Sequence, residues 1–187
     1  MSIILKSSKN VVVELGMGDG RLLEKLARSN PNFTYIGIEL DKQQYEDAKS
    51  RINLKNVILL YGSFEDLVPI FPDNSLDRVI SILPDPSFID QIKQQKWQPF
   101  YRVVYSKLKK YGSFYIATEI TDDLLLPISD EIYNKWVKWL TITFQSIGFE
   151  LTYKKEDIPT GYSTRCIDRF RHDSQRIRIV TLNFIKK

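Results

Sequence analysis

Apolar and amphipathic segments alternate along the first two thirds of this chain. Short apolar runs, typical of strands buried on both faces, are separated by segments with the period of amphipathic helices. The expected strands are Val11–Leu15, Phe33–Glu39, Val57–Tyr61, Leu76–Leu83 and Ser113–Thr118. The expected helices between them are Gly20–Ser29, Lys42–Asn53, Phe64–Pro69 and Pro99–Lys109. Such alternation predicts a parallel sheet with helices on both faces.

The last third of the chain departs from this alternation. Asp130–Ile147 has a helical period with Trp136 and Phe144 on one apolar stripe, which indicates a core-facing helix. Two more strands, Phe149–Tyr153 and Arg176–Phe184, follow as a hairpin-like pair. We therefore expect an α/β, Rossmann-like, mostly parallel sheet of seven strands with the last strand antiparallel. No linker divides the sequence, so residues 1–187 are expected to form a single domain.

A glycine-rich turn follows the first expected strand. It carries Gly16, Gly18 and Gly20, and an acid, Glu39, ends the second strand. Strand, glycine turn, helix, strand and acid form the layout of a nucleotide-cofactor crevice. Glu14 precedes the first glycine by two positions; its carboxylate would repel a pyrophosphate but attract a sulfonium or an ammonium. The pattern resembles motif I of class I S-adenosylmethionine methyltransferases, which implies that cofactor at these five residues.

Two further segments are expected at the same crevice, because ligands of such sheets bind beyond the carboxyl ends of the strands. Ser63 and Phe64 follow the third strand and either contact adenine or serve as a helix N-cap with a packed aromatic ring. Asp85 follows the fourth strand between two prolines that fix its backbone. It is expected either to orient a substrate or to cap the next helix.

Several motifs after the fourth strand resemble the tRNA (guanine-N7-)-methyltransferase family, and the likeness runs from about residue 10 to 185. That family has Phe-Pro-Asp-Pro-Trp after strand four, Ala-Thr-Asp at the end of strand five, and Thr-Lys-Phe-Glu-x-Arg before its last strand. The matching segments here are Pro84–Pro86 and Phe100, Leu108–Gly112, Ala117–Glu119 and Thr164–Arg169. The resemblance implies a tRNA substrate and N7-methylguanosine as product.

The chain departs from the family at positions that would meet the substrate. Ser87 stands in place of the tryptophan, Glu119 in place of the aspartate, and Ile167 in place of the glutamate. Two other hypotheses therefore remain open. One is a methyltransferase for a small molecule or a protein, and the other is a non-catalytic binding module on the same fold.

Methyl transfer to guanine N7 needs alignment more than proton transfer, because N7 carries a lone pair and no proton. An acid that accepts hydrogen bonds from guanine N1–H and N2–H would hold the base. We expect Asp85 to be this catalytic residue. The other expected substrate contacts are Thr118, Glu119, Thr164, Arg165, Lys93, Lys96 and Arg169.

Charge and composition agree with a polyanionic partner. Residues 154–187 carry nine Lys/Arg and four acids, within a net charge of +4 for the whole chain. Lys154 and Lys155 would extend an RNA contact, although a solvated surface explains such residues equally well. One cysteine, Cys166, fits a reducing cytoplasm; one histidine, His172, builds no metal site; and no apolar run predicts a membrane span. The chain has no separate RNA-binding domain, which leaves room for a partner subunit.

Overall fold

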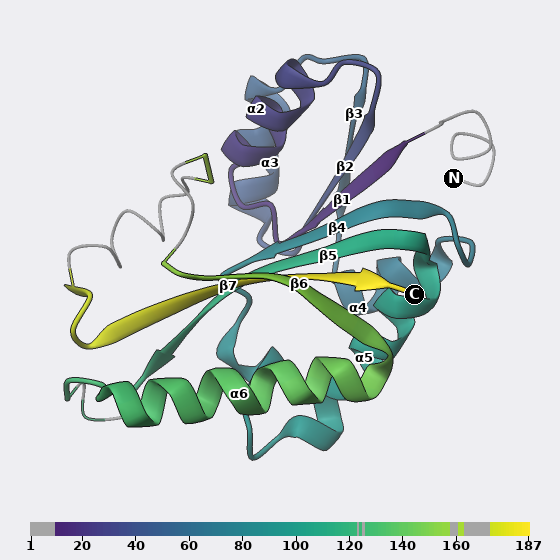
Figure 1. Ribbon diagram of the computed structural model, residues 1–187. Helices are drawn as coiled ribbons and strands as arrows, with labels where there is room; N and C mark the ends of the chain where they lie inside the picture. The colour runs from purple at the N-terminus through teal and green to yellow at the C-terminus, as the bar shows by residue number, and fades with distance from the viewer. Residues whose placement is uncertain (1–9, 123, 125, 158–160, 163–172) are drawn as a thin grey trace.

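The computed structural model describes residues 10–122, 124, 126–157, 161–162 and 173–187. Seven strands form one sheet in the order β3-β2-β1-β4-β5-β7-β6 (Figure 1). Strands β1 to β5 pair in parallel, and β7 runs antiparallel to both of its neighbours, β5 and β6. The expected mostly parallel sheet with an antiparallel last strand is confirmed. The order reverses direction between β1 and β4, which is the topological switch point of the sheet.

The first half of the chain follows the predicted elements closely. Its elements are β1 Val11–Leu15, α2 Arg21–Ser29, β2 Thr34–Glu39, α3 Lys42–Arg51, β3 Val57–Tyr61, α4 Phe64–Leu67, the 3₁₀ turn η1 Val68–Ile70 and β4 Leu76–Ile82. The second half comprises the 3₁₀ turn η2 Pro86–Phe88, α5 Gln94–Lys107, β5 Leu108–Thr121, α6 Asp130–Ile147, β6 Phe149–Glu156 and β7 Ile177–Lys186.

The largest differences from the prediction in the second half are the starts of α5 and β5. Helix α5 begins at Gln94, so Pro99 lies inside the helix instead of at its first position. The additional turn places Trp97 in the core with 2% of its surface exposed, and this burial favours the longer helix. Strand β5 begins at Leu108, and its ladder with β4 is irregular before Ser113. Tyr111 in this stretch has a φ of +65°, so the early part of β5 contains a bulge that no alternation pattern predicts.

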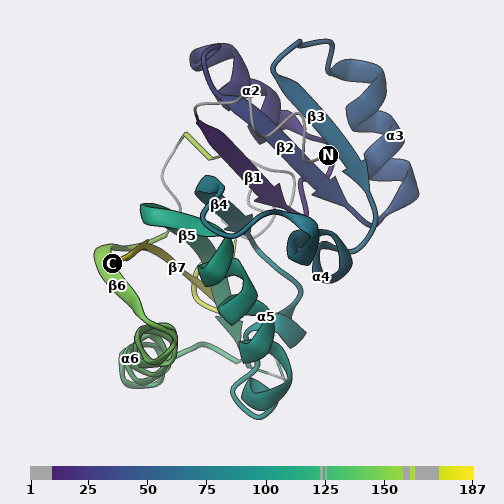
Figure 2. The same ribbon diagram turned by 90° about the vertical axis from the view of Figure 1, so that its right-hand side faces the viewer.

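Helices cover both faces of the sheet, as alternating side chains of the strands require. Val12 packs on one face with Leu22 and Leu23 of α2 and Ala48 of α3. Val11 and Val13 point to the other face, which is covered by α4, α5 and α6. Figures 1 and 2 show α5 and α6 on the side of the sheet away from α2.

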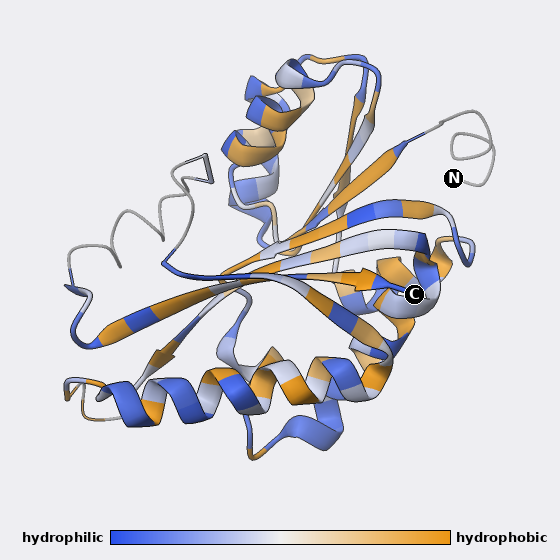
Figure 3. Cartoon of the chain, in the orientation of Figure 1, coloured by the Kyte–Doolittle hydropathy of each residue, from blue (hydrophilic) through white to orange (hydrophobic). Residues whose placement is uncertain are grey.

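Helix α6 is amphipathic along its whole length. Trp136, Leu140 and Phe144 are buried against the sheet, and Trp139 donates its indole N–H to Gln94 Oε1 at 3.0 Å. Hydrophobic and hydrophilic positions alternate along the helix in Figure 3. The aromatic residues of α6 are therefore core residues, as predicted. Among the helices of the described residues, none has the length and apolar character that a membrane crossing requires.

Candidate functional site

The carboxyl ends of β1, β2, β4 and β5 meet at one edge of the sheet. Glu14 of β1 is in register with Gly37 of β2 and with Ile80 of β4. Ala117 of β5 is in register with Ile82, near the end of β4. The turn after β1, Glu39 at the end of β2, the loop after β4, and Thr118 and Glu119 of β5 consequently line the same edge on both sides of the switch point.

The turn after β1 depends on glycine for two different reasons. Gly16 has a φ of +67° and Gly20 a φ of +72°, conformations that L side chains rarely adopt. A Cβ at Gly20 would lie 2.7 Å from Ile52 Cδ1 and 3.1 Å from Ala48 Cβ, so this glycine allows α2 to pack closely on α3. A Cβ at Gly16 would meet no atom within 4 Å. Gly16 therefore leaves an open side of the turn that a ligand can approach.

Glu39 links the end of β2 to this turn. Its Oε2 accepts a hydrogen bond from the N–H of Gly18 at 2.8 Å, and its Oε1 accepts one from the N–H of Asp41 at 2.8 Å. Each carboxylate oxygen has a second lone pair, so Glu39 can hold the turn and still accept hydrogen bonds from two hydroxyl groups.

Glu14 is a buried acid, and one of its two carboxylate oxygens has no partner among the described residues. Its side chain is 2% exposed, and the oxygen concerned is Oε2. Burial, together with the negative charges of Glu39 and Asp19, raises the pKa of Glu14 to about 8. A positively charged group in the crevice would relieve this repulsion and stabilise the carboxylate. The acids around the turn thus suit a cationic ligand.

Ser63 and Phe64 adopt the capping arrangement that the sequence left open. Ser63 Oγ accepts a hydrogen bond from the N–H of Glu65 at 3.1 Å and caps α4. The Phe64 ring packs against Phe88 and Phe100, with ring centroids 4.8 and 5.1 Å apart. Contact of this pair with a cofactor remains a prediction.

The loop after β4 begins with a strained residue. Leu83 has a φ of +51°, unusual for a bulky side chain, and its N–H donates to the Ala117 carbonyl at 2.7 Å. Asp85 follows with an exposed side chain, and its Oδ1 accepts a hydrogen bond from the N–H of Ser87 at 2.8 Å. Hydrogen bonding from Ser87 lowers the pKa of Asp85. Asp85 therefore caps η2 and is an ionised acceptor at neutral pH.

Thr118 and Glu119, near the end of β5, both carry polar atoms without partners, and their side chains point to opposite faces of the sheet. Thr118 is fully buried, and neither its Oγ1 nor Glu119 Oε2 has a hydrogen-bond partner among the described residues. Burial and the negative charge of Asp85 raise the pKa of Glu119 to about 7. Buried polar atoms without partners are costly, so a site that a polar ligand completes is the natural explanation.

Among the predicted lysine, arginine and Thr164 contacts with the substrate, only Lys93 and Lys96 belong to the described residues. Lys93 and Lys96 are exposed near the start of α5, and Lys93 pairs with Asp90 at 3.4 Å. Thr164, Arg165 and Arg169 lie outside the described residues. The structure therefore places the predicted acids, the predicted glycines and Thr118 at one edge of the sheet, namely Glu14, Gly16, Gly18, Gly20, Glu39, Asp85, Thr118 and Glu119.

One contact on the face of the sheet that α2 covers was not predicted. Tyr162 stacks on Tyr115 of β5 with ring centroids 4.6 Å apart, and Arg78 Nη2 donates to the Tyr162 hydroxyl at 2.8 Å. Lys25 of α2 donates to the Gly161 carbonyl at 3.2 Å. These contacts attach Gly161 and Tyr162 to the sheet beside α2. No sequence pattern relates Arg78 to a tyrosine 84 residues later.

Comparison with known proteins gives several relatives described as tRNA (guanine-N(7)-)-methyltransferases. A tRNA (guanine-N(7)-)-methyltransferase from Wolbachia pipientis wMel is 23% identical over 97% of this chain and 78% of its own length. A protein of the same description from Yersinia enterocolitica is 33% identical, but the match covers 58% of this chain and 48% of that protein. This chain thus spans about half the length of the second relative.

Solved structures share the fold. A crystal structure described as the 16S rRNA methyltransferase KamB superposes with a TM-score of 0.76 and 20% identity, covering 100% of this chain and 92% of the other. A family model described as "Putative methyltransferase" matches residues 8–160, which is most of the chain. The protein belongs to this methyltransferase family, as a class I S-adenosylmethionine methyltransferase that resembles the tRNA (guanine-N7-)-methyltransferases.

Proposed function

We propose that this protein methylates RNA with S-adenosylmethionine as the methyl donor, and that its product is N7-methylguanosine in tRNA. One observation carries the proposal. The acid-rich glycine turn at the ends of β1 and β2 stands beside a second group of polar residues, Asp85, Thr118 and Glu119, across the switch point. One side suits a cationic nucleoside, and the other suits a base with several hydrogen-bonding atoms.

The residues around the glycine turn fit the cofactor. Glu39 can accept hydrogen bonds from both ribose hydroxyls while it holds Gly18. Glu14 is buried, and its Oε2 has no partner among the described residues; the positive charge of the sulfonium and the ammonium would stabilise its carboxylate. The open side of Gly16 permits close approach to the backbone. S-adenosylmethionine, when bound, supplies an electrophilic methyl group on sulfur.

The residues at the ends of β4 and β5 fit a guanine acceptor. Guanine N7 needs no general base, and the protein's task is to hold the ring so that N7 faces the methyl group. Ionised Asp85 can accept from N1–H and N2–H of the base, with Glu119 as a second acceptor. The names of the relatives support tRNA as the substrate.

Ribosomal RNA is the second candidate acceptor. The likeness to a 16S rRNA methyltransferase supports this alternative, and so does the absence of the family's tryptophan at Ser87. Both candidates use the same cofactor side of the site, and they differ in the nucleotide presented to Asp85 and Glu119.

The decisive experiment incubates the purified protein with S-adenosylmethionine and either unmodified bulk tRNA or unmodified small ribosomal subunits. The RNA is digested and methylated nucleosides are identified by mass spectrometry, with Asp85→Asn as the matched control. New N7-methylguanosine in tRNA that is lost in the variant supports the proposal. A different methylated nucleoside would show that the acceptor is not guanine N7. Product only in the ribosomal subunit would show that the substrate is ribosomal RNA. Cofactor binding without any RNA product refutes RNA methylation by this chain alone.

A further inference from the structure

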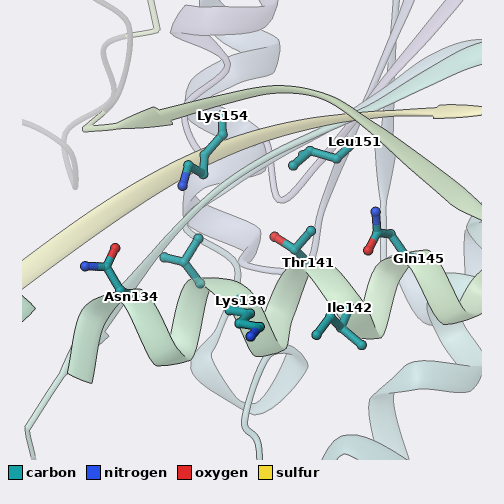
Figure 4. A pocket seen from close by; sticks show the side chains of 8 residues that line it. Asn134, Lys138, Thr141, Ile142, Gln145, Leu151 and Lys154 are labelled. Carbon is teal, nitrogen blue, oxygen red and sulfur yellow. The ribbon is translucent and has the colours of Figure 1, made fainter. Parts of the chain in front are cut away.

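A groove lies between α6 and β6, away from the cofactor turn. It has a volume of about 340 Å³. Lys138 and Asn134 of α6 and Lys154 of β6 surround one end of it, while Leu151 of β6 and Val137 of α6 contribute apolar surface (Figure 4). In Figure 4 Lys154 and Leu151 extend from the strand toward the helix.

The charge of this groove is positive and uncompensated. Its lining includes two lysines and no acid. Three neighbouring acids are engaged elsewhere, since Asp130 and Glu156 both pair with Arg178, and Glu150 pairs with Lys187 at 3.2 Å. Neither Lys138 nor Lys154 forms an ion pair within the described part of the chain. Two ammonium groups at one end of a groove favour an anion such as a phosphate diester.

The remainder of the groove suits a flat apolar group with polar edges. Leu151 and Val137 offer side-chain carbon, and the amide groups of Asn134 and Gln145 lie at opposite ends of the helical wall. Single-stranded nucleic acids are recognised by this combination, in which a base rests on apolar or aromatic surface and basic side chains follow the backbone.

The groove is close to the candidate site along the sheet. Lys154 is in register with Leu182 of β7, and Leu182 is in register with Ile116 of β5, two residues before Thr118. Strand β6 is two strand spacings from β5, which is about 10 Å. The lysine end of the groove therefore lies about two strand spacings from the part of β5 that leads into the candidate site.

We propose that the α6–β6 groove is a second RNA-binding subsite, which holds a nucleotide outside the methyl-accepting one. Its base packs on Leu151 and Val137, and its phosphates contact Lys138 and Lys154. This inference rests on the proposed function, because it takes the substrate to be RNA.

The test compares two variants with the same change of charge. Lys138→Glu/Lys154→Glu alters the groove, whereas Lys55→Glu/Lys110→Glu alters two exposed lysines near the amino ends of β3 and β5, away from the candidate site. Binding of unmodified tRNA is measured by fluorescence anisotropy between 50 and 200 mM salt, with S-adenosylmethionine affinity and thermal unfolding as controls for folding.

We expect the groove variant to bind RNA at least about 10-fold more weakly, with a salt slope smaller by about 1.4 to 1.8 because two phosphate contacts are lost. KM for RNA should rise while kcat at saturating RNA and cofactor affinity stay unchanged. Equal RNA affinity in the two variants would overturn the groove as an RNA site and leave the proposed function intact. A wild-type protein that neither binds nor methylates RNA would overturn both.

Discussion

Glu39 and Gly18 are joined by a hydrogen bond of 2.8 Å across 21 residues, from the backbone N–H of the glycine to the carboxylate. The acid at the end of β2 thus fixes the turn after β1. Glu39→Ala should weaken S-adenosylmethionine binding at least about 100-fold, because charge-assisted hydrogen bonds contribute about 1.5–3 kcal/mol each. Glu39→Gln should be intermediate, since an amide oxygen can still accept from Gly18. Isothermal titration calorimetry measures both, and unchanged affinity in the alanine variant would remove Glu39 from the cofactor site.

The two glycines at the ends of the turn should respond differently to the same substitution. Gly16→Ala places a methyl group in open space, so it should cost about 1–2 kcal/mol of stability from its positive φ and reduce cofactor affinity. Gly20→Ala carries the same backbone strain and additionally meets Ile52 Cδ1 at 2.7 Å, so its loss of stability should be larger. Thermal unfolding and calorimetry together separate the two effects. The opposite ranking of stabilities would contradict the packing role of Gly20.

Much of this arrangement could be predicted because its physical causes are local in the sequence. A parallel strand buried on both faces is a short apolar run, and β1 and β3 were predicted with the bounds that the structure gives. Glycines at alternate positions after such a strand indicate a turn with positive φ. Pro99 misled the prediction of α5 because proline usually marks the first turn of a helix, whereas here burial of Trp97 favours an earlier start.

Other features depend on contacts between segments that are distant in the sequence, so no local sequence pattern predicts them. The positive φ of Leu83 and the Arg78–Tyr162 hydrogen bond both result from tertiary packing. Burial raises the pKa of Glu119 most, and the charge of Asp85 raises it further; Asp85 follows another strand and can be placed near Glu119 only when the sheet order is known.

Glu14 should make the protein less stable as the pH rises. The folded protein keeps a proton on Glu14 up to about pH 8, whereas the unfolded chain releases it near 4.5. The native state therefore binds more protons over this interval, and its free energy of unfolding falls with pH by at most about 1.4 kcal/mol per unit. Glu14→Gln should remove this loss, so its advantage over wild type should grow from pH 5 to pH 8. Urea unfolding across that pH range measures the effect, with Glu65→Gln as a control at an exposed glutamate. If the stabilities of Glu14→Gln and wild type changed in parallel with pH, Glu14 would not be the group responsible.

Asp85 can be tested as an acceptor separately from its role as a cap. Asn and Asp cap helices about equally well, so Asp85→Asn should keep the hydrogen bond from Ser87 and the melting temperature. It should nevertheless lower kcat/KM for RNA at least about 100-fold, because the ionised acceptor for the base is lost. Asp85→Ala should lose the cap as well, at about 1 kcal/mol. Full activity in the asparagine variant, with instability in the alanine variant, would leave Asp85 as a cap alone.

Glu119 should impose a pH dependence on the reaction. Burial and the charge of Asp85 raise its pKa to about 7, and only the ionised form can accept hydrogen bonds on both oxygens. The value of kcat/KM for RNA should therefore rise by up to about tenfold per pH unit below 7 and level off above it. Glu119→Gln should give a lower rate without this step.

Asp85→Asn removes the neighbouring negative charge, so it should shift the residual step to lower pH, since a weaker repulsion favours ionisation of Glu119. Guanine N7 has no proton to lose, so the acceptor contributes no titration of its own at that atom. A step that stays at the same pH in Asp85→Asn would show that the two carboxyl groups are not coupled, and a step that persists in Glu119→Gln would assign it to another group.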